Sequence, residues 1–570
     1  MKPLLLPITF VSILLGITLF CYQPGPERAV TLENIAVCGP AYSGVSAKTA
    51  EGKFIVALPG WGHYSYPVTV KSDSAQFYFD QGLSMYYSYH FKESVASFKE
   101  SERLENNNPM SLWGQALAMG PYYNAAHSYT KPAGLAEVLK SMNEEAVSAS
   151  PKEKQLIEAM NSRYSADPTD SDRPALNLAY AQKIKELISL HPDDQDIAVL
   201  YIDAMMVIHA WDFWSKDGTS KPWTPELVRI CEKVLKTNPK HPAALHYYIH
   251  LTEASRHPEV SLGGAETLRD LLPGVAHMVH MASHAYERSG LYSKGVEVNN
   301  LADDNLLYYD LLAKNLSLNK HSPHYFAVQS YCALSGGMYS EAMRYAKRCN
   351  KSVAPTAETT YDQYLYMIPV MTLVRMGKWD LILKDSIVPD SRWTYASLLS
   401  DFAKGIAFVN TGQVDSAAVH LEQLRTKMKD PILTQRRIPF NSPIQVAGIA
   451  ESILNAAILF ARNEHVLAIA SLENAVKLED KLIYTEPKDW PIPARQFLGA
   501  YLLKSGKPAQ AQKVYQEDLI FNPGNGWSLL GMYQSIRAQG KKQHLASYKA
   551  RYQTAFAHAD QIPSHSVFMK

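Results

Sequence analysis

The sequence predicts an all-α solenoid of stacked helix pairs, preceded by a short extended lead-in. Helical periodicity runs through most of the 570 residues, and clusters of Pro, Gly or Asn interrupt it every few dozen residues. Turn residues also recur at a spacing of 34, as from Gly506 to Gly540 and from Pro239 to Pro273. A repeat array explains how one chain of this length, 46% hydrophobic, buries its apolar stripes, because each helix pair packs against the next.

The first 21 residues predict export. Lys2 precedes an uncharged stretch from Leu4 to Phe20, as in a secretory signal peptide. Cys21 then stands where a lipid-modified cysteine would, although Phe20 is larger than the small residue usual before one. The stretch can also remain as a short membrane anchor. We therefore expect a periplasmic or cell-envelope protein, with residues 1–21 cleaved, lipidated at Cys21 or retained as a tether.

Composition excludes several classes of partner and site. Lys and Arg number 56 against 55 Asp and Glu, and no basic run offers a surface for phosphates, so we expect no nucleic acid partner. The five cysteines have no regular spacing, which predicts neither a disulfide framework nor a thiolate metal cluster. The chain also lacks a Gly-rich phosphate loop and a GxSxG motif.

We divide the rest of the chain into three parts. Residues 22–72 contain FIVALPGWG and YPVTV, which predict extended segments or a short hairpin. Residues 73–560 form the helical repeats, with an inserted segment at 214–223, and residues 561–570 form a tail. Within the repeats, second helices are expected to begin after four turn signals: Gly290-Leu-Tyr292, Gly337-Met-Tyr339, Gly377-Lys-Trp379 and Gly412-Gln-Val414.

The sequence GAYLLKSGKPAQAQKVYQEDLIF, from Gly499 to Phe521, resembles the tetratricopeptide (TPR) consensus. The match includes Gly499 at the helix crossing, Gly506 before the turn, Ala511 at the close contact and the following Pro523. The resemblance implies a solenoid with the first helix of each pair on the inner face. It also implies that ligands meet the second, fifth, ninth and twelfth places of each unit, which share one helix face.

Histidines fall at these places in the middle repeats. If units begin at Pro242 and Ala276, then two HxxxH pairs, each followed by a glutamate, occupy the fifth, ninth and twelfth places. These residues are His246, His250 and Glu253, and then His280, His284 and Glu287. His277 and His324 fill second places, and His321 lies just before His324. Counting from Pro192 puts Asp203 at a ninth place, near His209 and Asp212 of HAWDFW.

This arrangement predicts a metal site. Two histidines four apart on a helix can hold one ion, and a carboxylate one turn later offers a third ligand of the kind used for zinc or non-haem iron. The two rows can bracket one ion or two. The alternatives are a chance HxxxH, copied with its repeat, and histidines that only bond tyrosines such as Tyr247, Tyr248 and Tyr286. The spacing lacks the HExxH order of zinc peptidases, so it indicates no reaction.

Two further groups each allow two interpretations. Trp211, Asp212 and Trp214 either line the site or anchor the inserted segment to the groove, and we place Trp211 and Asp212 in the lining with Asp203, His209, Tyr247 and His321. In EPKDWPIPARQ, Glu486, Asp489, Trp490 and Arg495 either bind a substrate carboxylate through Arg495 or form a capping salt bridge.

Most of residues 60–560 resemble a family of exported bacterial TPR proteins. The shared motifs are AQFYFDQGL, LWGQALAMGPYYN, HAWDFW, HYYIH, HMVHMASH, HSPH and DWPIPARQFLGAYLL. Similar proteins often have HMPSH where this chain has HMASH, and more histidines near GHYSYP, where this chain has only His63. The resemblance implies the fold and the grouping of the motifs, and it names no reaction.

Together these observations predict an exported TPR solenoid whose inner face binds a divalent transition metal, Zn, Fe or Cu. The predicted metal ligands are His246, His250, His280 and His284, with His277, His324, Glu253 and Glu287 as second candidates. If the site is catalytic, hydrolysis and oxidation of a small-molecule substrate fit equally well. The alternative functions are a metal-free module that binds a peptide or an envelope protein, and a passive scaffold.

Overall fold

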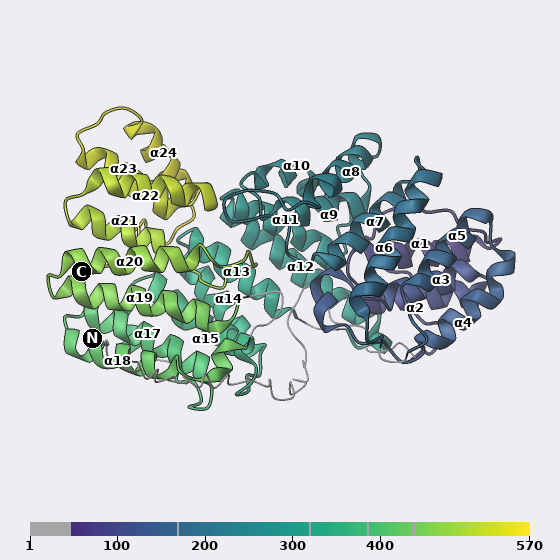
Figure 1. The fold of residues 1–570 in the computed structure, drawn as a ribbon, viewed down its shortest axis with the longest axis horizontal. Helices are drawn as coiled ribbons and strands as arrows, with labels where there is room; N and C mark the ends of the chain where they lie inside the picture. The colour runs from purple at the N-terminus through teal and green to yellow at the C-terminus, as the bar shows by residue number, and fades with distance from the viewer. Residues whose placement is uncertain (1–46, 168–169, 319–320, 385–386, 436–440, 570) are drawn as a thin grey trace, which may run out of the picture. The chain divides into compact units, whose positions relative to one another are not determined.

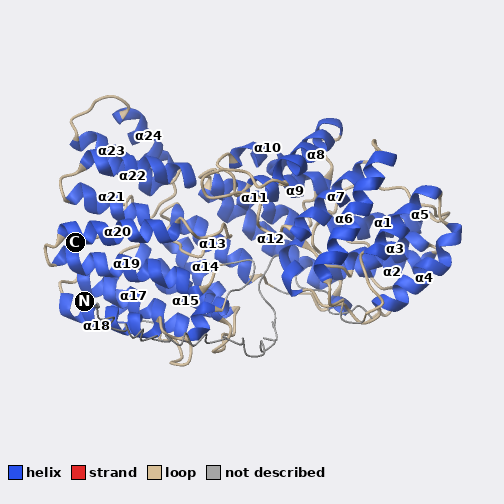
Figure 2. Cartoon of the chain, viewed as in Figure 1, coloured by secondary structure: helices blue, strands red, loops and turns tan. Residues whose placement is uncertain are grey.

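The computed structural model describes residues 47–167, 170–318, 321–384, 387–435 and 441–569. In these ranges the chain forms 24 α-helices and five 3-10 helices, and its only strand-like pairing is an isolated bridge between Trp214 and Ser220 (Figure 2). The structure therefore confirms the all-α prediction. The expected signal peptide, anchor and lipidated Cys21 lie outside the described residues.

The first twelve α-helices are α1 (Asp73–Tyr87), α2 (Phe91–Leu104), α3 (Pro109–Ala118), α4 (Leu135–Glu145), α5 (Pro151–Ser162), α6 (Arg173–Leu190), α7 (Gln195–Ile208), α8 (Thr224–Thr237), α9 (Pro242–Thr252), α10 (Leu262–Leu271), α11 (Ala276–Arg288) and α12 (Tyr292–Leu312). The others are α13 (Pro323–Ser335), α14 (Tyr339–Lys351), α15 (Thr360–Arg375), α16 (Trp379–Lys384), α17 (Thr394–Asn410), α18 (Val414–Lys427), α19 (Pro443–Ala461), α20 (His465–Glu479), α21 (Ala494–Lys504), α22 (Pro508–Phe521), α23 (Gly526–Ala538) and α24 (Leu545–Ala555). The 3-10 helices are η1 (Tyr123–Ser128), η2 (Ala146–Ser148), η3 (Pro258–Ser261), η4 (Lys314–Leu316) and η5 (Pro431–Thr434).

Successive helices pack as pairs, and each pair packs on the next; α17 to α23 lie side by side in one such stack (Figure 1). The four turn signals are followed by α12, α14, α16 and α18, which begin at the predicted residues. The glycine of each of these turns has a positive φ, between 63° and 86°, which a residue with a Cβ adopts only at a cost. The predicted units at Pro242 and Ala276 also begin helices, α9 and α11.

Small residues let the helices approach closely. A Cβ on Gly499 would lie 2.3 Å from the ring of Tyr515, so α21 and α22 can cross here only with glycine. The buried apolar side chains of the described residues form three clusters, one of which contains Tyr515. Helix α19 is uncharged apart from Glu451 and long enough to span a bilayer, and it packs against α17, α18 and α20 as a core helix does.

The lead-in is extended where it is described, from residue 47 to residue 72, and it forms no hairpin there. It is held along the helices by specific bonds. The Leu58 N–H donates to Gln81, and Tyr64 donates to Asp196 with an O···O distance of 2.5 Å. Gly60 lies against Gly274, where a Cβ would come within 2.7 Å of backbone. This segment therefore contacts α1, α7 and the turn before α11.

Candidate metal centre

Three successive first helices bring six histidines together. His246 and His250 lie one turn apart on α9, His277, His280 and His284 lie on one side of α11, and His324 is the second residue of α13. Helices α9 and α11 are in contact, and so are α11 and α13. All six side chains are buried, with relative exposures of 0 to 4%. The inner-face placement predicted from the repeat places brings these histidines together.

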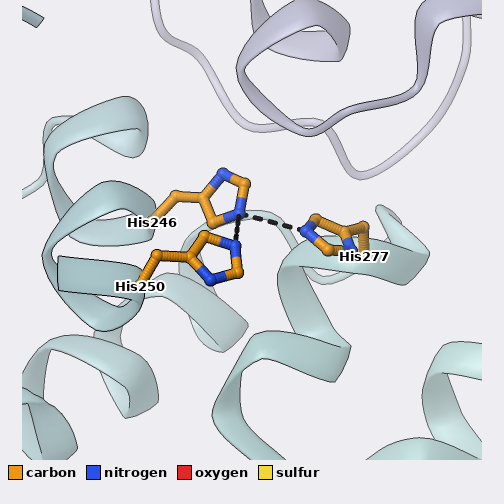
Figure 3. Close-up of side chains that lie close together, drawn as sticks. All are labelled: His246, His250 and His277. Carbon is orange, nitrogen blue, oxygen red and sulfur yellow. Dashed lines mark hydrogen bonds between the residues drawn. The ribbon is translucent and has the colours of Figure 1, made fainter. Parts of the chain in front are cut away.

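The first triad consists of His246, His250 and His277. His246 and His250 come from one helix and point toward His277 on the next (Figure 3). The Nε2 atom of His246 lies 3.1 Å from that of His250 and 3.0 Å from that of His277. Two ligands of one ion, each bonded at 2.0–2.1 Å and about 95° apart, are separated by about 3.0 Å. The Nε2 atom of His246 thus has the spacing to the other two that ligands of a single ion have.

The second triad consists of His280, His284 and His324. The Nε2 atom of His280 lies 2.9 Å from that of His284 and 3.1 Å from that of His324. In each triad the ligand nitrogens all lie within 4.8 Å of one another. The second triad therefore repeats the geometry of the first.

The repeat explains this duplication. Each triad takes the fifth and ninth places of one unit and the second place of the following unit. Equivalent histidines such as His250 and His284 consequently belong to different triads, with ring centroids 6.0 Å apart. Each of the two rows predicted from sequence therefore supplies two histidines to a triad of its own.

The partners of the Nδ1 atoms decide which nitrogen carries the proton. His246 Nδ1 lies 2.6 Å from the Tyr87 carbonyl oxygen, and His280 Nδ1 lies 2.5 Å from Asn299 Oδ1. The Asn299 amide nitrogen donates to the Gly295 carbonyl, which turns the amide oxygen toward His280. Because carbonyl oxygens only accept, the Nδ1 atoms of His246 and His280 carry the protons, and their Nε2 atoms present lone pairs.

Glu253 joins the two triads behind their ligand nitrogens. Its carboxylate oxygens lie 3.1 Å from His250 Nδ1 and 3.3 Å from His284 Nδ1. Glu486, from the loop between α20 and α21, also contacts His284 Nδ1. With an ionised Glu253 as the acceptor of its Nδ1–H, His250 likewise turns its Nε2 lone pair inward. Lone pairs about 3 Å apart repel one another unless a cation lies between them.

Burial determines the protonation of these side chains. Desolvation lowers the pKa of His250 and His280 to about 3. Desolvation and the neighbouring histidines hold the pKa of His246, His277 and His284 well below the usual range. The imidazoles are therefore neutral at pH 7, which is the form that binds metal.

The pKa values of the carboxyl groups of Glu253 and Glu486 are raised, whereas those of the histidines are lowered. Burial first, and then the charge of Glu287, raises the pKa of Glu253. Burial, and then the charge of Glu253, raises the pKa of Glu486. Ionising both without a nearby cation is therefore unfavourable.

Aromatic rings surround the first triad. Tyr89 lies 4.6 Å from His246, and Tyr123 lies 4.9 Å from His250, measured between ring centroids. Trp211 stacks on Tyr123 at 5.0 Å. Tyr89 and Trp211 both have a positive φ, 58° and 64°, which is costly for large side chains. Such strain is kept where the surrounding structure fixes it, commonly at functional sites.

The other predicted residues lie at different distances from the triads. Tyr247 packs against His246 at 5.4 Å, and Asp203 accepts a bond from Tyr86 behind it. Glu287, predicted as a ligand, is buried beside the charges of Lys488 and Arg288 and belongs to neither triad.

Three residues predicted to line the site lie apart from the triads. His209 stacks on Trp223 at 3.6 Å, and the half-exposed Asp212 pairs with Lys221. His321 bonds Asp303 with its ring 42% exposed. Each follows or precedes an inner-face helix rather than lying within one, so the helical spacing that places the triads does not apply to it.

Sequence reasoning placed Trp211 in the lining, but it missed the contact of Glu486 with His284, the bond of Asn299 to His280, and the rings of Tyr89 and Tyr123. Glu486 is 202 residues from His284 and sits in an irregular loop, so no spacing points to it. Arg495 instead forms a bidentate salt bridge with Asp480, in accord with the capping interpretation. Trp214 donates to the Leu251 carbonyl at 2.7 Å, so it anchors the inserted segment to α9.

No family model and no curated protein matches the chain. Solved structures similar to it include the human IFIT1 dimer with m7Gppp-AAAA, at 12% identity over 86% of this chain and 96% of that chain, with a TM-score of 0.34. Yeast Tom70 is similar at 10% identity over 84% and 92%, with a TM-score of 0.28. The Cut9–Hcn1 hetero-tetramer of APC/C is similar at 12% identity over 86% and 95%, with a TM-score of 0.28. At such low TM-scores these likenesses carry no argument about function.

Proposed function

We propose that this TPR-type solenoid binds transition metal through the two histidine triads of its inner face. The observation that supports this most strongly is the direction of the lone pairs. His246 and His280 each donate a hydrogen bond from Nδ1–H to a carbonyl oxygen. The Nε2 atom of each then faces two other imidazole nitrogens at 2.9 to 3.1 Å. Such convergence is unfavourable in a dry core and becomes favourable when a metal ion accepts the lone pairs.

The surrounding residues have the properties expected of a metal site. Backbone, amide and carboxylate oxygens fix the orientation of the rings, which is how outer-shell partners support histidine ligands. The ligand set, three imidazoles for each ion, suits zinc or copper. Any bound substrate would meet a cation able to polarise an oxygen atom or to activate oxygen.

A metal-free groove that binds a peptide is less well supported. A peptide would have to contact the inner face, yet the six histidines are at most 4% exposed. The Glu486 loop and the aromatic rings cover them. Peptide binding at this place would therefore require these side chains to leave the groove.

Metal content tests the proposal. The full chain, purified without a histidine tag, is analysed for bound elements before and after incubation with zinc, copper and iron. The double variant His250→Ala/His284→Ala removes one ligand from each triad and is expected to lose the metal. The double variant His209→Ala/His321→Ala removes two histidines outside the triads and is expected to keep it. Less than about a tenth of an equivalent in the wild type, with no uptake, would refute metal binding.

A further inference from the structure

The two triads are neighbours and lie as close to each other as their own members do. Ring centroids of His277 and His280 are 5.9 Å apart across the boundary, and those of His250 and His284 are 6.0 Å apart. The longest separations within a triad are 6.4 Å, between His250 and His277, and 6.2 Å, between His284 and His324. Two ions held by the triads would thus form a pair of the kind that acts jointly on one ligand, about 4 Å apart.

We propose that the triads hold a pair of copper ions, and that the pair binds one molecule of dioxygen between the ions. This inference rests on the proposed metal binding and adds the number of ions, the metal and the ligand class.

The donor set favours copper. Each ion would receive three neutral imidazole nitrogens, and neither triad contains a carboxylate or a cysteine among the described residues. Non-haem iron sites of the oxygenase type use two histidines and a carboxylate, and manganese and magnesium prefer oxygen ligands. Imidazole alone suits copper and zinc, and copper binds more tightly than zinc at a given nitrogen site.

Charge favours copper in its monovalent form. The ionisable groups nearest the triads are of both signs, because the buried carboxyl groups of Glu253, Glu486 and Glu287 lie near Arg288 and Lys488. Two doubly charged ions repel each other four times as strongly as two singly charged ions at the same distance. A buried pair with neutral ligands is therefore best filled by two Cu(I) ions, a state that zinc does not have.

Dioxygen is a suitable ligand because it can accept the two electrons of a Cu(I) pair and because it is small enough to reach buried side chains. Each Cu(I) gives one electron, so that two Cu(II) ions and one peroxide dianion form, with no proton taken up and no change in the net charge. Release of dioxygen returns both electrons to the copper pair. The step needs no counter-ion and no further reductant, and a small neutral molecule can reach side chains that are 0 to 4% exposed more readily than a peptide can.

The test uses the untagged full chain, depleted of metal and loaded anaerobically with Cu(I). We expect two copper ions per chain, uptake of one dioxygen per pair, and a near-ultraviolet charge-transfer band that disappears when oxygen is removed. The oxidised pair is expected to give little electron paramagnetic resonance signal, because the two Cu(II) spins couple through the bridging ligand. The variant His324→Ala is expected to keep one copper and to lose dioxygen binding, while His321→Ala behaves as the wild type.

Other outcomes separate this inference from the proposed function. Uptake of one copper per chain, preference for zinc in competition, or two copper ions that give no reversible band would overturn the copper pair and leave metal binding in place. Absence of any bound metal would overturn both. Because the wild type alone decides these outcomes, a variant that fails to fold does not weaken the test.

Discussion

Glu253 is expected to have opposite effects on the metal-free and the metal-bound protein. Its carboxyl group is hydrogen-bonded to His250 Nδ1 at 3.1 Å and lies 3.3 Å from His284 Nδ1, near the carboxyl group of Glu486. The change Glu253→Gln leaves one accepting oxygen where two carboxyl oxygens face His250 and His284, and it turns an NH₂ group toward one of these Nδ1 atoms. Loss of such an outer-shell acceptor typically lowers metal affinity 10- to 100-fold, which is about 1.4–2.7 kcal/mol.

The metal-free protein should instead become more stable. Burial and Glu287 raise the pKa of Glu253, and each unit of such a shift makes the ionised folded state less favourable by about 1.4 kcal/mol. Replacing the ionisable carboxyl group by an amide should thus raise the free energy of unfolding at pH 7. Urea denaturation measures this stability, and titration against a competing chelator measures the affinity.

Glu287 provides a matched control, because it occupies the same repeat place one unit later. It lies beside Lys488 and Arg288 and not on a histidine of either triad. Glu287→Gln should therefore leave the metal affinity within about threefold, since no ligand loses its acceptor. The reasoning fails if Glu253→Gln destabilises the metal-free protein and binds metal as tightly as the wild type.

Three other predictions concern local contacts. Burial raises the pKa of Asp196 to about 6, so the stabilising contribution of its protonated form is present below pH 3.8 and is lost as the pH rises through 6. Between pH 4 and pH 7 the free energy of unfolding of the wild type should therefore fall by about 2 kcal/mol relative to that of Asp196→Asn. Urea stability curves that stay parallel over this pH range would contradict this. Gly499→Ala should destabilise the protein by about 1–3 kcal/mol, because the new Cβ overpacks the crossing of α21 and α22. Gly506→Ala should destabilise it less, because its new Cβ meets nothing within 4 Å and only the positive φ is unfavourable. Equal changes in the denaturation midpoint would show that the crossing is not tight. Asn299→Leu removes the acceptor of His280 and should weaken only the second triad, about tenfold, so chelator titration that finds both triads equally affected would refute this role.

The sequence was sufficient to predict the repeat and the places of the histidines. Helix starts at Pro242, Ala276 and Tyr292 follow from proline, the 34-residue period and glycine turns, which are local signals. From those starts, the fifth, ninth and second places could be counted. The repeat numbering contains the second-place histidine of each unit. That this histidine joins the triad of the preceding unit becomes evident only when the stacking of α9 on α11 is known.

The rest of the site depends on contacts that no local pattern encodes. Tyr87 contributes a backbone oxygen, for which side-chain identity gives no signal. Glu486 reaches His284 from a loop without helical spacing, and the orientation of Asn299 depends on its own bond to Gly295. Conversely, Asp212 and His321 were placed in the lining by proximity in sequence, although they lie outside the inner-face helices.

Anomalous diffraction from crystals of the untagged protein, recorded at the absorption edge of the bound metal, tests the central claim most directly. We expect two peaks, each about 2.1 Å from the Nε2 atoms of one triad: His246, His250 and His277, or His280, His284 and His324. A single peak between Glu253, His284 and Glu486, which also lie within 4.8 Å of one another, would contradict it. So would triads that stay without a peak in crystals soaked with copper or zinc.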